Sequence, residues 1–375
     1  MMSESEIARL RKQMELAHEA SVWALNGLSS GTAQHAFISA RMRHMDSCYQ
    51  HLSTLVGEEQ AIGVLCEVFD GEKHTERDEP LEHVSVPKPA EEENAQPGGC
   101  EHRRSTTTAP DLVPTSWSEI NPLDLRHYLL RLLLYSDYAA LISPSTQRIL
   151  DVGCGTGLWV CDMARQFPLA QITGLDLDLS HLPAPWPANC QFVAGDVLVG
   201  LPFADESFDF VHQRCLADQL SIPTWPMVAR ELARVTRPGG WIELVELGQS
   251  ITNPGPATSR YLRWWTQWSE HTGIHTTVVE HLAELLQQAG LDQVAQRRII
   301  APAGQWGRQA GTLLMADMLE IMQAMRQRFS TTLHLSLALF DDTIEALPAE
   351  WEEYHTAFHF YLAYGRKTTH IPEKG

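Results

Sequence analysis

Three glycines at alternate positions mark the segment ILDVGCGTGLW, residues 149–159. They follow an apolar run that ends in Asp151 and precede a segment with helical periodicity. A strand that turns sharply through Gly153, Gly155 and Gly157 into a helix presents bare backbone N–H groups to a ligand. The spacing therefore predicts a site for a nucleotide-like cofactor.

The residues around the glycines narrow the choice of cofactor. A dinucleotide site favours G-x-G-x-x-G, but Leu158 stands where its third glycine belongs. A Walker loop requires a lysine after the glycines, and none follows them. An acid ahead of alternating glycines suits a cofactor that joins a cationic amino acid to a nucleoside. S-adenosylmethionine is such a cofactor.

Two further acids close later strand candidates. Asp176 lies in TGLDLD at the end of the second strand candidate, where a carboxylate can accept hydrogen bonds from both ribose hydroxyls. Asp196 lies in VAGDV, where it can accept one from the adenine amino group. Each acid alone is common in ordinary turns, but three acids closing three successive strands predict cofactor binding.

Strand and helix candidates alternate from residue 118 onward. This alternation predicts an α/β fold with a parallel sheet covered by helices on both faces. A helix is predicted over 124–142, and a mostly helical insert over about 306–356. The strand candidates are RILDVG, QITGLDL, QFVAGDV, FDFVHQR, GWIELVEL, VAQRRIIA and FHFYLAYGRK.

Residues 1–69 form a separate helical region in this interpretation, and residues 70–117 are rich in Pro, Glu and Thr and predict a disordered linker. Whether the helical hairpin packs on the rest of the chain, forms a homodimer or recruits a partner stays open, with self-packing favoured. Its two apolar stripes are Ile7, Leu10, Met14 and Ala17, and Ile38, Met42, Met45, Tyr49 and Leu52.

Composition excludes several functions. The 375 residues carry a formal charge of −19, which disfavours nucleic acid or an anionic membrane as the main partner. Seven scattered cysteines without a C-x-x-C pair indicate neither a disulfide framework nor a zinc site, and no acids or histidines have metal-ligand spacing. No stretch reaches the roughly 18 apolar residues of a membrane span, so we expect a cytoplasmic protein.

Four segments resemble the successive motifs of class I S-adenosylmethionine-dependent methyltransferases, whose fold is Rossmann-like. These segments are ILDVGCGTGLW, ITGLDLD, AGDVLVGLPFADESFDFVHQR and RVTRPGGWIELVEL. More narrowly, NPLDLRHYLLRLLLYSDYAALISP, APAGQWGR and YLAYGRK are similar to the LaeA-like (UMTA, TAM-domain) methyltransferases of fungal secondary metabolism. The resemblance covers about 118–367. It implies a mostly parallel seven-stranded sheet with a helical lid insert.

The resemblance also implies cofactor-binding positions. The family often has Thr or another small residue at Cys154, a departure we expect to be harmless. The implied positions are Asp151, Gly153, Gly155 and Gly157 for the methionine end, Asp176 for the ribose, Asp196 and Val197 for the adenine, Gln213 and Arg214 beneath the cofactor, and Thr156 and Leu177 within the same motifs.

Methyl transfer to a hydroxyl needs a base to remove its proton. The candidates are His212 and Glu246 near strand ends, and His271 and His275 in the following segment. Period-2 alternation could instead turn His212 toward a packed helix, which makes a structural histidine as plausible as a base.

Aromatic residues recur at helical spacing after the fifth strand: Tyr261, Trp264, Trp265 and Trp268. They form either the buried face of a helix, which is favoured, or a stacking surface for the acceptor. No NPPY-like element follows the fourth strand, which disfavours methylation of planar amino groups. The leading hypothesis is O-methylation of a small hydrophobic acceptor; the alternatives are a protein methyltransferase and a LaeA-like regulator that retains the cofactor pocket without turnover.

Overall fold

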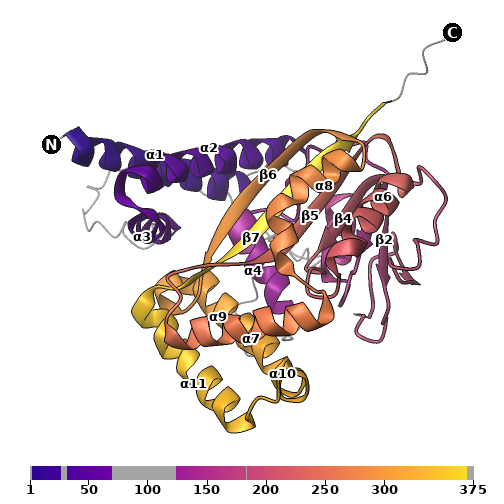
Figure 1. Ribbon diagram of the computed structural model, residues 1–375. Helices are drawn as coiled ribbons and strands as arrows, with labels where there is room; N and C mark the ends of the chain where they lie inside the picture. Colours follow the sequence, from indigo (N-terminus) through magenta and orange to yellow (C-terminus); the bar gives the residue numbers. More distant parts are fainter. Residues whose placement is uncertain (1, 27–31, 70–123, 183, 370–375) are drawn as a thin grey trace, which may run out of the picture.

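The computed structural model describes residues 2–26, 32–69, 124–182 and 184–369 (Figure 1). The linker predicted over 70–117 lies outside these residues. Among the helices that are described, none combines the length and apolar character that a bilayer crossing requires.

A seven-stranded sheet forms the centre of the chain, in the order β3-β2-β1-β4-β5-β7-β6. The first five strands pair in parallel, and β7 runs antiparallel to both β5 and β6. The mostly parallel sheet is therefore confirmed. Its strands are β1 Arg148–Val152, β2 Gln171–Asp176, β3 Cys190–Ala194, β4 Phe208–Arg214, β5 Thr236–Thr252, β6 Leu291–Pro302 and β7 Ala357–Lys367.

The strand order reverses between β1 and β4, because the chain proceeds from β1 outward to β3 and then returns to place β4 on the other side. Parallel pairing brings the carboxyl ends of these strands to one edge of the sheet. Ligands of open α/β sheets bind outside the carboxyl ends at such a reversal. The fold thus gathers the residues after β1, β2, β3 and β4 at one place.

Helices cover both faces of the sheet (Figure 1). Helix α5 (Leu158–Gln166) packs on one face, where its buried Trp159 meets Phe210 of β4. Helices α6 (Trp225–Val235) and α8 (Leu282–Gln288) pack on the other, in a core that includes Leu232 and Leu286. Apolar residues spaced three and four apart on α6 explain its docking by one stripe.

The helix predicted over 124–142 is wrong in its second half. Helix α4 spans only Leu125–Leu134 and ends at Tyr135, whose φ of 51° is left-handed. The chain then follows an irregular path, in which Ala139 and Ala140 donate their N–H groups to the carboxylate of Glu243 at 2.7 and 2.6 Å. Tertiary hydrogen bonds thus override an apolar sequence of high helix propensity.

The helical insert predicted over about 306–356 is confirmed. It contains η6 (Gln305–Gly307), α9 (Arg308–Ala324), α10 (Arg326–Leu333) and α11 (Leu337–Tyr354). With α4 and α7 (Pro256–Thr272) these helices enclose one apolar core, in which Phe329, Phe340 and Trp351 are fully buried. Figure 1 shows α7, α9, α10 and α11 grouped together beside the ends of β6 and β7.

The N-terminal residues form three helices, α1 (Met2–Asn26), α2 (Thr32–Val56) and α3 (Glu58–Phe69). The stripe members Leu10, Met14, Ala17, Met45, Tyr49 and Leu52 are buried, while the side chains of Ile38 and Met42 lie outside the described part. Their core also includes Tyr135, Ile300 and Ala357, and Arg298 of β6 forms an ion pair with Glu58 at 2.6 Å. The helices therefore pack on the rest of the chain, and a homodimer through them stays a prediction.

Candidate active site

The glycine turn after β1 has the backbone that the sequence requires. Gly153, Gly155 and Gly157 have φ values of 75°, 53° and 74°, which is the left-handed region. A Cβ on Gly153 or Gly157 would lie 2.7 Å from the side chains of Leu216 and Phe192, whereas a Cβ on Gly155 would meet nothing within 4 Å. Side chains therefore pack closely against the turn at Gly153 and Gly157, whereas the space beside Gly155 is open.

The turn departs from the prediction in its hydrogen bonding. Gly153 and Cys154 donate their N–H groups to the carbonyl of Leu175, and Gly157 donates to that of Cys154. The Gly155 N–H donates to the carboxylate of Asp176 at 2.7 Å. The amides of Gly153, Cys154, Gly155 and Gly157, which we expected to be bare, are therefore engaged within the protein. Helix α5 begins directly after them, and no side chain caps its N-terminus at Gly157.

The two strand-end acids lie at the same edge. Asp176 is the last residue of β2, and Asp196 follows β3 and accepts the N–H of Leu198 at 2.8 Å. Val197 is buried beside Asp196, and Leu177 is 67% exposed. Vicinal hydroxyls and an adenine amino group match these carboxylates, which act as acceptors. The open glycine and the two acids together fit the nucleoside portion of S-adenosylmethionine.

Thr156 connects the turn to α4. Its hydroxyl donates to the carboxylate of Asp124 at 2.5 Å, directly before α4 begins. Helix α4 thereby lies over the carboxyl edge of the sheet. This contact could not be read from the sequence because 32 residues separate its partners.

Asp151, His212 and Glu243 form a buried row across β1, β4 and β5, where the strand register sets them side by side. His212 Nδ1 lies 2.7 Å from Asp151 Oδ1, and its Nε2 lies 4.0 Å from Glu243 Oε1. Its ring also stacks on Trp159 at 4.0 Å. Asp151 and His212 are each 1% exposed, and burial raises the pKa of Glu243.

This row bears on the roles predicted for His212 and Asp151. A histidine enclosed by an indole and two carboxyl groups has no open path to an acceptor, so the geometry favours the structural alternative for His212. Asp151 faces His212, and its place at the methionine end of the cofactor stays a prediction. Sequence reasoning missed Glu243, because only the register of three strands reveals it.

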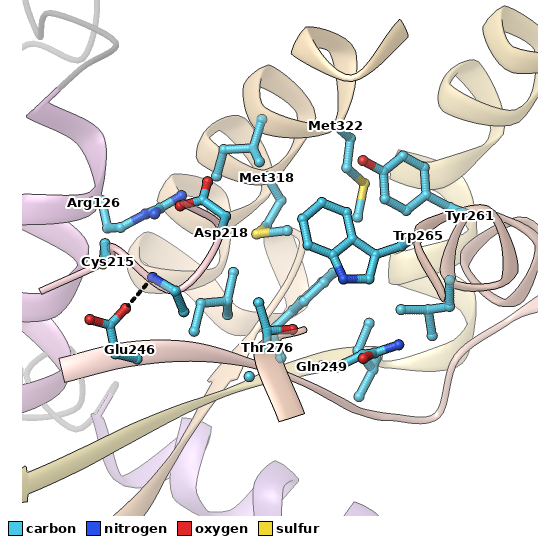
Figure 2. Close-up of a pocket in the computed structure, with 17 residues that line it drawn as sticks. Arg126, Cys215, Asp218, Glu246, Gln249, Tyr261, Trp265, Thr276, Met318 and Met322 are labelled. Atoms are coloured by element: carbon cyan, nitrogen blue, oxygen red, sulfur yellow. Dashed lines mark hydrogen bonds between the residues drawn. The ribbon is translucent and has the colours of Figure 1, made fainter. Parts of the chain in front are cut away.

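A pocket lies beside the carboxyl end of β5, between α4, α7 and α9 (Figure 2). One end carries Arg126, Cys215, Asp218 and Glu246; the other is formed by Tyr261, Trp265 and Met322. The lining is mainly apolar. Its remaining members are Ala217, Leu247, Gly248, Gln249, Ile251, Leu262, Thr276, Met318, Ile321 and Phe358.

Glu246 is the predicted base candidate that this pocket contains. It is fully buried, its Oε2 accepts the N–H of Ala217 at 3.0 Å, and its Oε1 accepts the Gln213 amide at 3.3 Å. Burial raises the pKa of Glu246 to about 8. Gln213 thus links the pocket to the strand that borders the glycine turn, and a carboxyl group with this pKa can exchange a proton near neutral pH.

Other polar groups frame the same end of the pocket. Arg126 forms an ion pair with Asp317 of α9 at 3.0 Å, which ties α4 to the helical insert. Burial raises the pKa of Asp218, and burial raises that of Cys215 to about 11. Sequence reasoning missed Arg126, Cys215 and Asp218. They lie on α4 and just after β4, and no sequence motif links such distant positions.

The aromatic stripe of α7 divides between two roles. Tyr261 and Trp265 line the pocket, whereas Trp264 and Trp268 lie in the core against Phe340 and Phe329. Tyr261 also packs in this core, with its ring centroid 5.4 Å from that of Phe329. The favoured buried-face interpretation therefore holds for Tyr261, Trp264 and Trp268, and a stacking surface for the acceptor stays a prediction.

The structure does not bring His271 or His275 to the pocket. His271 is exposed near the end of α7, where its Nδ1 donates to the carbonyl of Gln267 at 2.7 Å. His275 is half-buried and precedes η5 (Thr276–His281). Neither lies among the lining residues, so the base role of both is not supported.

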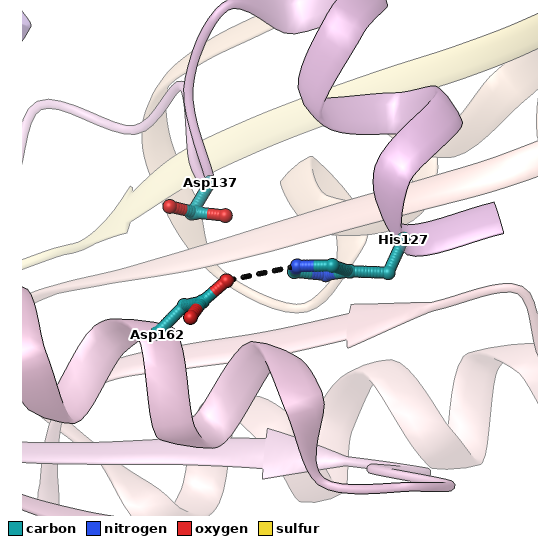
Figure 3. Close-up of side chains that lie close together, drawn as sticks. All are labelled: His127, Asp137 and Asp162. Atoms are coloured by element: carbon teal, nitrogen blue, oxygen red, sulfur yellow. Dashed lines mark hydrogen bonds and ion pairs between the residues drawn. The ribbon is translucent and has the colours of Figure 1, made fainter. Parts of the chain in front are cut away.

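A second polar cluster lies under α4, made of His127, Asp137 and Asp162 (Figure 3). One ligand atom from each lies within 4.8 Å of the others, the arrangement of a metal site. However, the Arg131 guanidinium reaches Asp162 at 2.7 Å and Asp137 at 3.3 Å. An arginine cation therefore already occupies the position that would favour a metal ion.

Comparisons with known proteins agree with this geometry. A family profile described as "Methyltransferase domain" matches residues 119–296. Methyltransferase pytC of Aspergillus terreus is 30% identical over 225 residues, which are 56% of this chain and 68% of pytC. The chain belongs to the class I S-adenosylmethionine-dependent methyltransferases. The strand order, with an antiparallel β7 between β5 and β6, is that of this fold.

Further similarities of this methyltransferase are to a regulator of secondary metabolism and to two solved structures. Secondary metabolism regulator laeA of Aspergillus fumigatus is 29% identical to this chain over 205 residues. The chain spans 54% of the length of laeA. The [4+2]-cyclase SpnF has 21% identity and a TM-score of 0.39, covering 60% of this chain and 75% of SpnF. Phosphoethanolamine N-methyltransferase 2 of Haemonchus contortus has 15% identity and a TM-score of 0.40, covering 67% and 60%. Both structural similarities are weak, and the fold rests on the topology.

Proposed function

We propose that this methyltransferase transfers a methyl group to a hydroxyl oxygen of a small, mainly apolar molecule bound between α7, α9 and β5. The observation that carries the proposal is Glu246, a buried carboxyl group with a raised pKa at the polar end of an otherwise apolar pocket. A hydroxyl placed there meets a base, and the rest of the acceptor meets aromatic and aliphatic side chains.

The chain's own residues supply positioning and proton removal. Tyr261 and Trp265 present ring surface to a planar acceptor, and Met318 and Met322 adapt to its outline. Ionised Glu246 takes the hydroxyl proton, while the Ala217 N–H holds the carboxyl group in place. The bound cofactor supplies an electrophilic methyl group. Alignment of acceptor and methyl group contributes several kcal/mol to lowering the barrier.

The relatives support a role in secondary metabolism. Two of them are named for methyl transfer and for regulation of secondary metabolism, respectively. The mainly apolar lining of the pocket favours a small apolar molecule over a protein side chain as the acceptor. A protein acceptor and a regulator without turnover are the competing outcomes of the experiment below.

The test uses the purified chain, S-adenosylmethionine labelled in its methyl group, and an organic extract of the source organism. Label in an apolar small molecule, lost in Glu246→Gln and retained in Glu353→Gln, supports the proposal. Glu353 is an exposed glutamate of α11 and serves as the matched control. Label in protein, or turnover unaffected by Glu246→Gln, contradicts it.

A further inference from the structure

Arg214 has an unusual environment for a half-buried arginine. It is the last residue of β4, at the carboxyl edge where the strand order reverses. Its Nη2 donates to Nδ1 of His127 at 2.9 Å. Among the described residues, no carboxylate oxygen lies within 4.0 Å of its guanidinium, although the chain carries a formal charge of −19. Its nearest polar partner is therefore a neutral ring and not an anion.

The ring that holds Arg214 is itself fixed. His127 is 3% exposed, and its Nε2 lies 3.0 Å from Asp162 Oδ2. Burial lowers the pKa of His127. A neutral ring satisfies both contacts in one tautomer only: Nε2–H donates to Asp162, and the Nδ1 lone pair accepts from Arg214.

Asp162 anchors this tautomer. It accepts further hydrogen bonds from Arg131 at 2.7 Å and Arg165 at 2.5 Å. Burial opposes its ionisation, but the hydrogen bond from His127 and the nearby arginines lower the pKa of Asp162. Figure 3 shows the His127 ring held by Asp162. An ionised Asp162 and a neutral His127 thus hold the guanidinium of Arg214, the last residue of β4, at the carboxyl edge of the sheet.

The sheet order determines which part of the cofactor meets Arg214. The carboxylates suited to ribose and adenine follow β2 and β3, on one side of the glycine turn. The amino-acid end of S-adenosylmethionine then extends the other way, toward β4. That end carries the cofactor's single carboxylate, the anion that Arg214 lacks.

We propose that Arg214 binds the carboxylate of the cofactor's methionine portion, and that His127 and Asp162 are positioning residues that hold its guanidinium for this contact. The inference rests on the methyl-donor site and is independent of the acceptor. It also accounts for a buried histidine and a half-buried aspartate at the junction of α4 and α5 that the methyl-transfer step does not use.

The test compares two ligands by calorimetry: S-adenosylhomocysteine and its decarboxylated counterpart, which lacks only the carboxylate. Arg214→Met is expected to weaken S-adenosylhomocysteine binding by about tenfold to a hundredfold, the range of a charge-assisted hydrogen bond. Binding of the decarboxylated ligand stays unchanged. Arg237→Met is the matched control, because Arg237 pairs with Asp209 at the opposite end of β4.

Two outcomes overturn the assignment of Arg214. One is an equal loss for both ligands, which indicates a structural role; the other is an unchanged affinity for S-adenosylhomocysteine. If the unaltered protein binds neither ligand, the donor site itself is wrong, and that failure is distinguishable because no variant is needed to see it.

The positioning role has its own readout. His127→Asn keeps an acceptor near the place of Nδ1, and it should retain S-adenosylhomocysteine affinity within about threefold. His127→Phe removes the acceptor and should lose about tenfold for S-adenosylhomocysteine alone. Full affinity in His127→Phe contradicts the positioning role. Should that variant fail to fold, a tenfold loss in His127→Asn contradicts it equally.

Discussion

The raised pKa of Glu246 makes a prediction about stability that needs no acceptor. A carboxyl group with an ordinary value of 4.5 and a folded value of about 8 keeps its proton in the folded state while the unfolded chain releases it. The folded state therefore loses stability as pH rises from about 4.5 to about 8. With about 1.4 kcal/mol for each pH unit, the loss between pH 6 and pH 9 is about 2.6 kcal/mol.

Glu246→Gln removes this proton exchange while keeping a side chain of similar shape. We expect the stability of the variant, measured relative to the original chain, to be about 2.6 kcal/mol higher at pH 9 than at pH 6. Urea unfolding at both pH values, followed by far-UV circular dichroism, measures the difference. Glu353→Gln, at an exposed site, should show no such change.

The same titration governs catalysis. If ionised Glu246 is the base, its ionised fraction rises from about one tenth at pH 7 to about nine tenths at pH 9, so kcat rises about tenfold. A stability difference between Glu246→Gln and the original chain that stays constant from pH 6 to pH 9 would refute the reasoning about burial. A flat kcat profile over that range would refute the base role.

Three further predictions concern the scaffold. Gly157→Val should cost about 2–5 kcal/mol of unfolding free energy, because its φ is left-handed and its Cβ meets Phe192; an unchanged melting temperature contradicts this. His212→Leu should destabilise the fold by about 3 kcal/mol, since it removes the ring that pairs with the buried Asp151 carboxylate, and native stability with lost turnover would restore His212 as a base candidate. Deleting residues 1–117 should leave a folded core that binds S-adenosylhomocysteine with lower thermal stability, and an insoluble product contradicts the proposed boundary at 118; light scattering of both forms tests whether the N-terminal helices make a dimer.

The sequence predicted much of the fold because its signals are local. Strand candidates stood out by apolar runs and turn residues, and three alternating glycines marked a turn that has left-handed backbone at each of them. The end of α4 at Tyr135 was not predictable in this way. It depends on a hydrogen bond to Glu243, more than 100 residues away in the chain.

The site was predictable in its cofactor half and much less so in its acceptor half. Asp176 and Asp196 follow strands whose order the family resemblance implied, so their convergence could be expected. The choice among base candidates could not, because it depends on which side chain faces a cavity. Glu246 lines the pocket, His212 is buried against Trp159 of α5, and His271 is on the surface.

The most direct test of the cofactor site is calorimetry of S-adenosylhomocysteine with Gly155→Leu. Its matched control is Gly290→Leu, because both glycines have left-handed backbone and no atom within 4 Å of an added Cβ, yet Gly290 lies between α8 and β6. The account predicts binding by the original chain and by Gly290→Leu, and none by a folded Gly155→Leu. Equal affinity in all three, or no binding by the original chain, would contradict the claim that this turn holds the methyl donor.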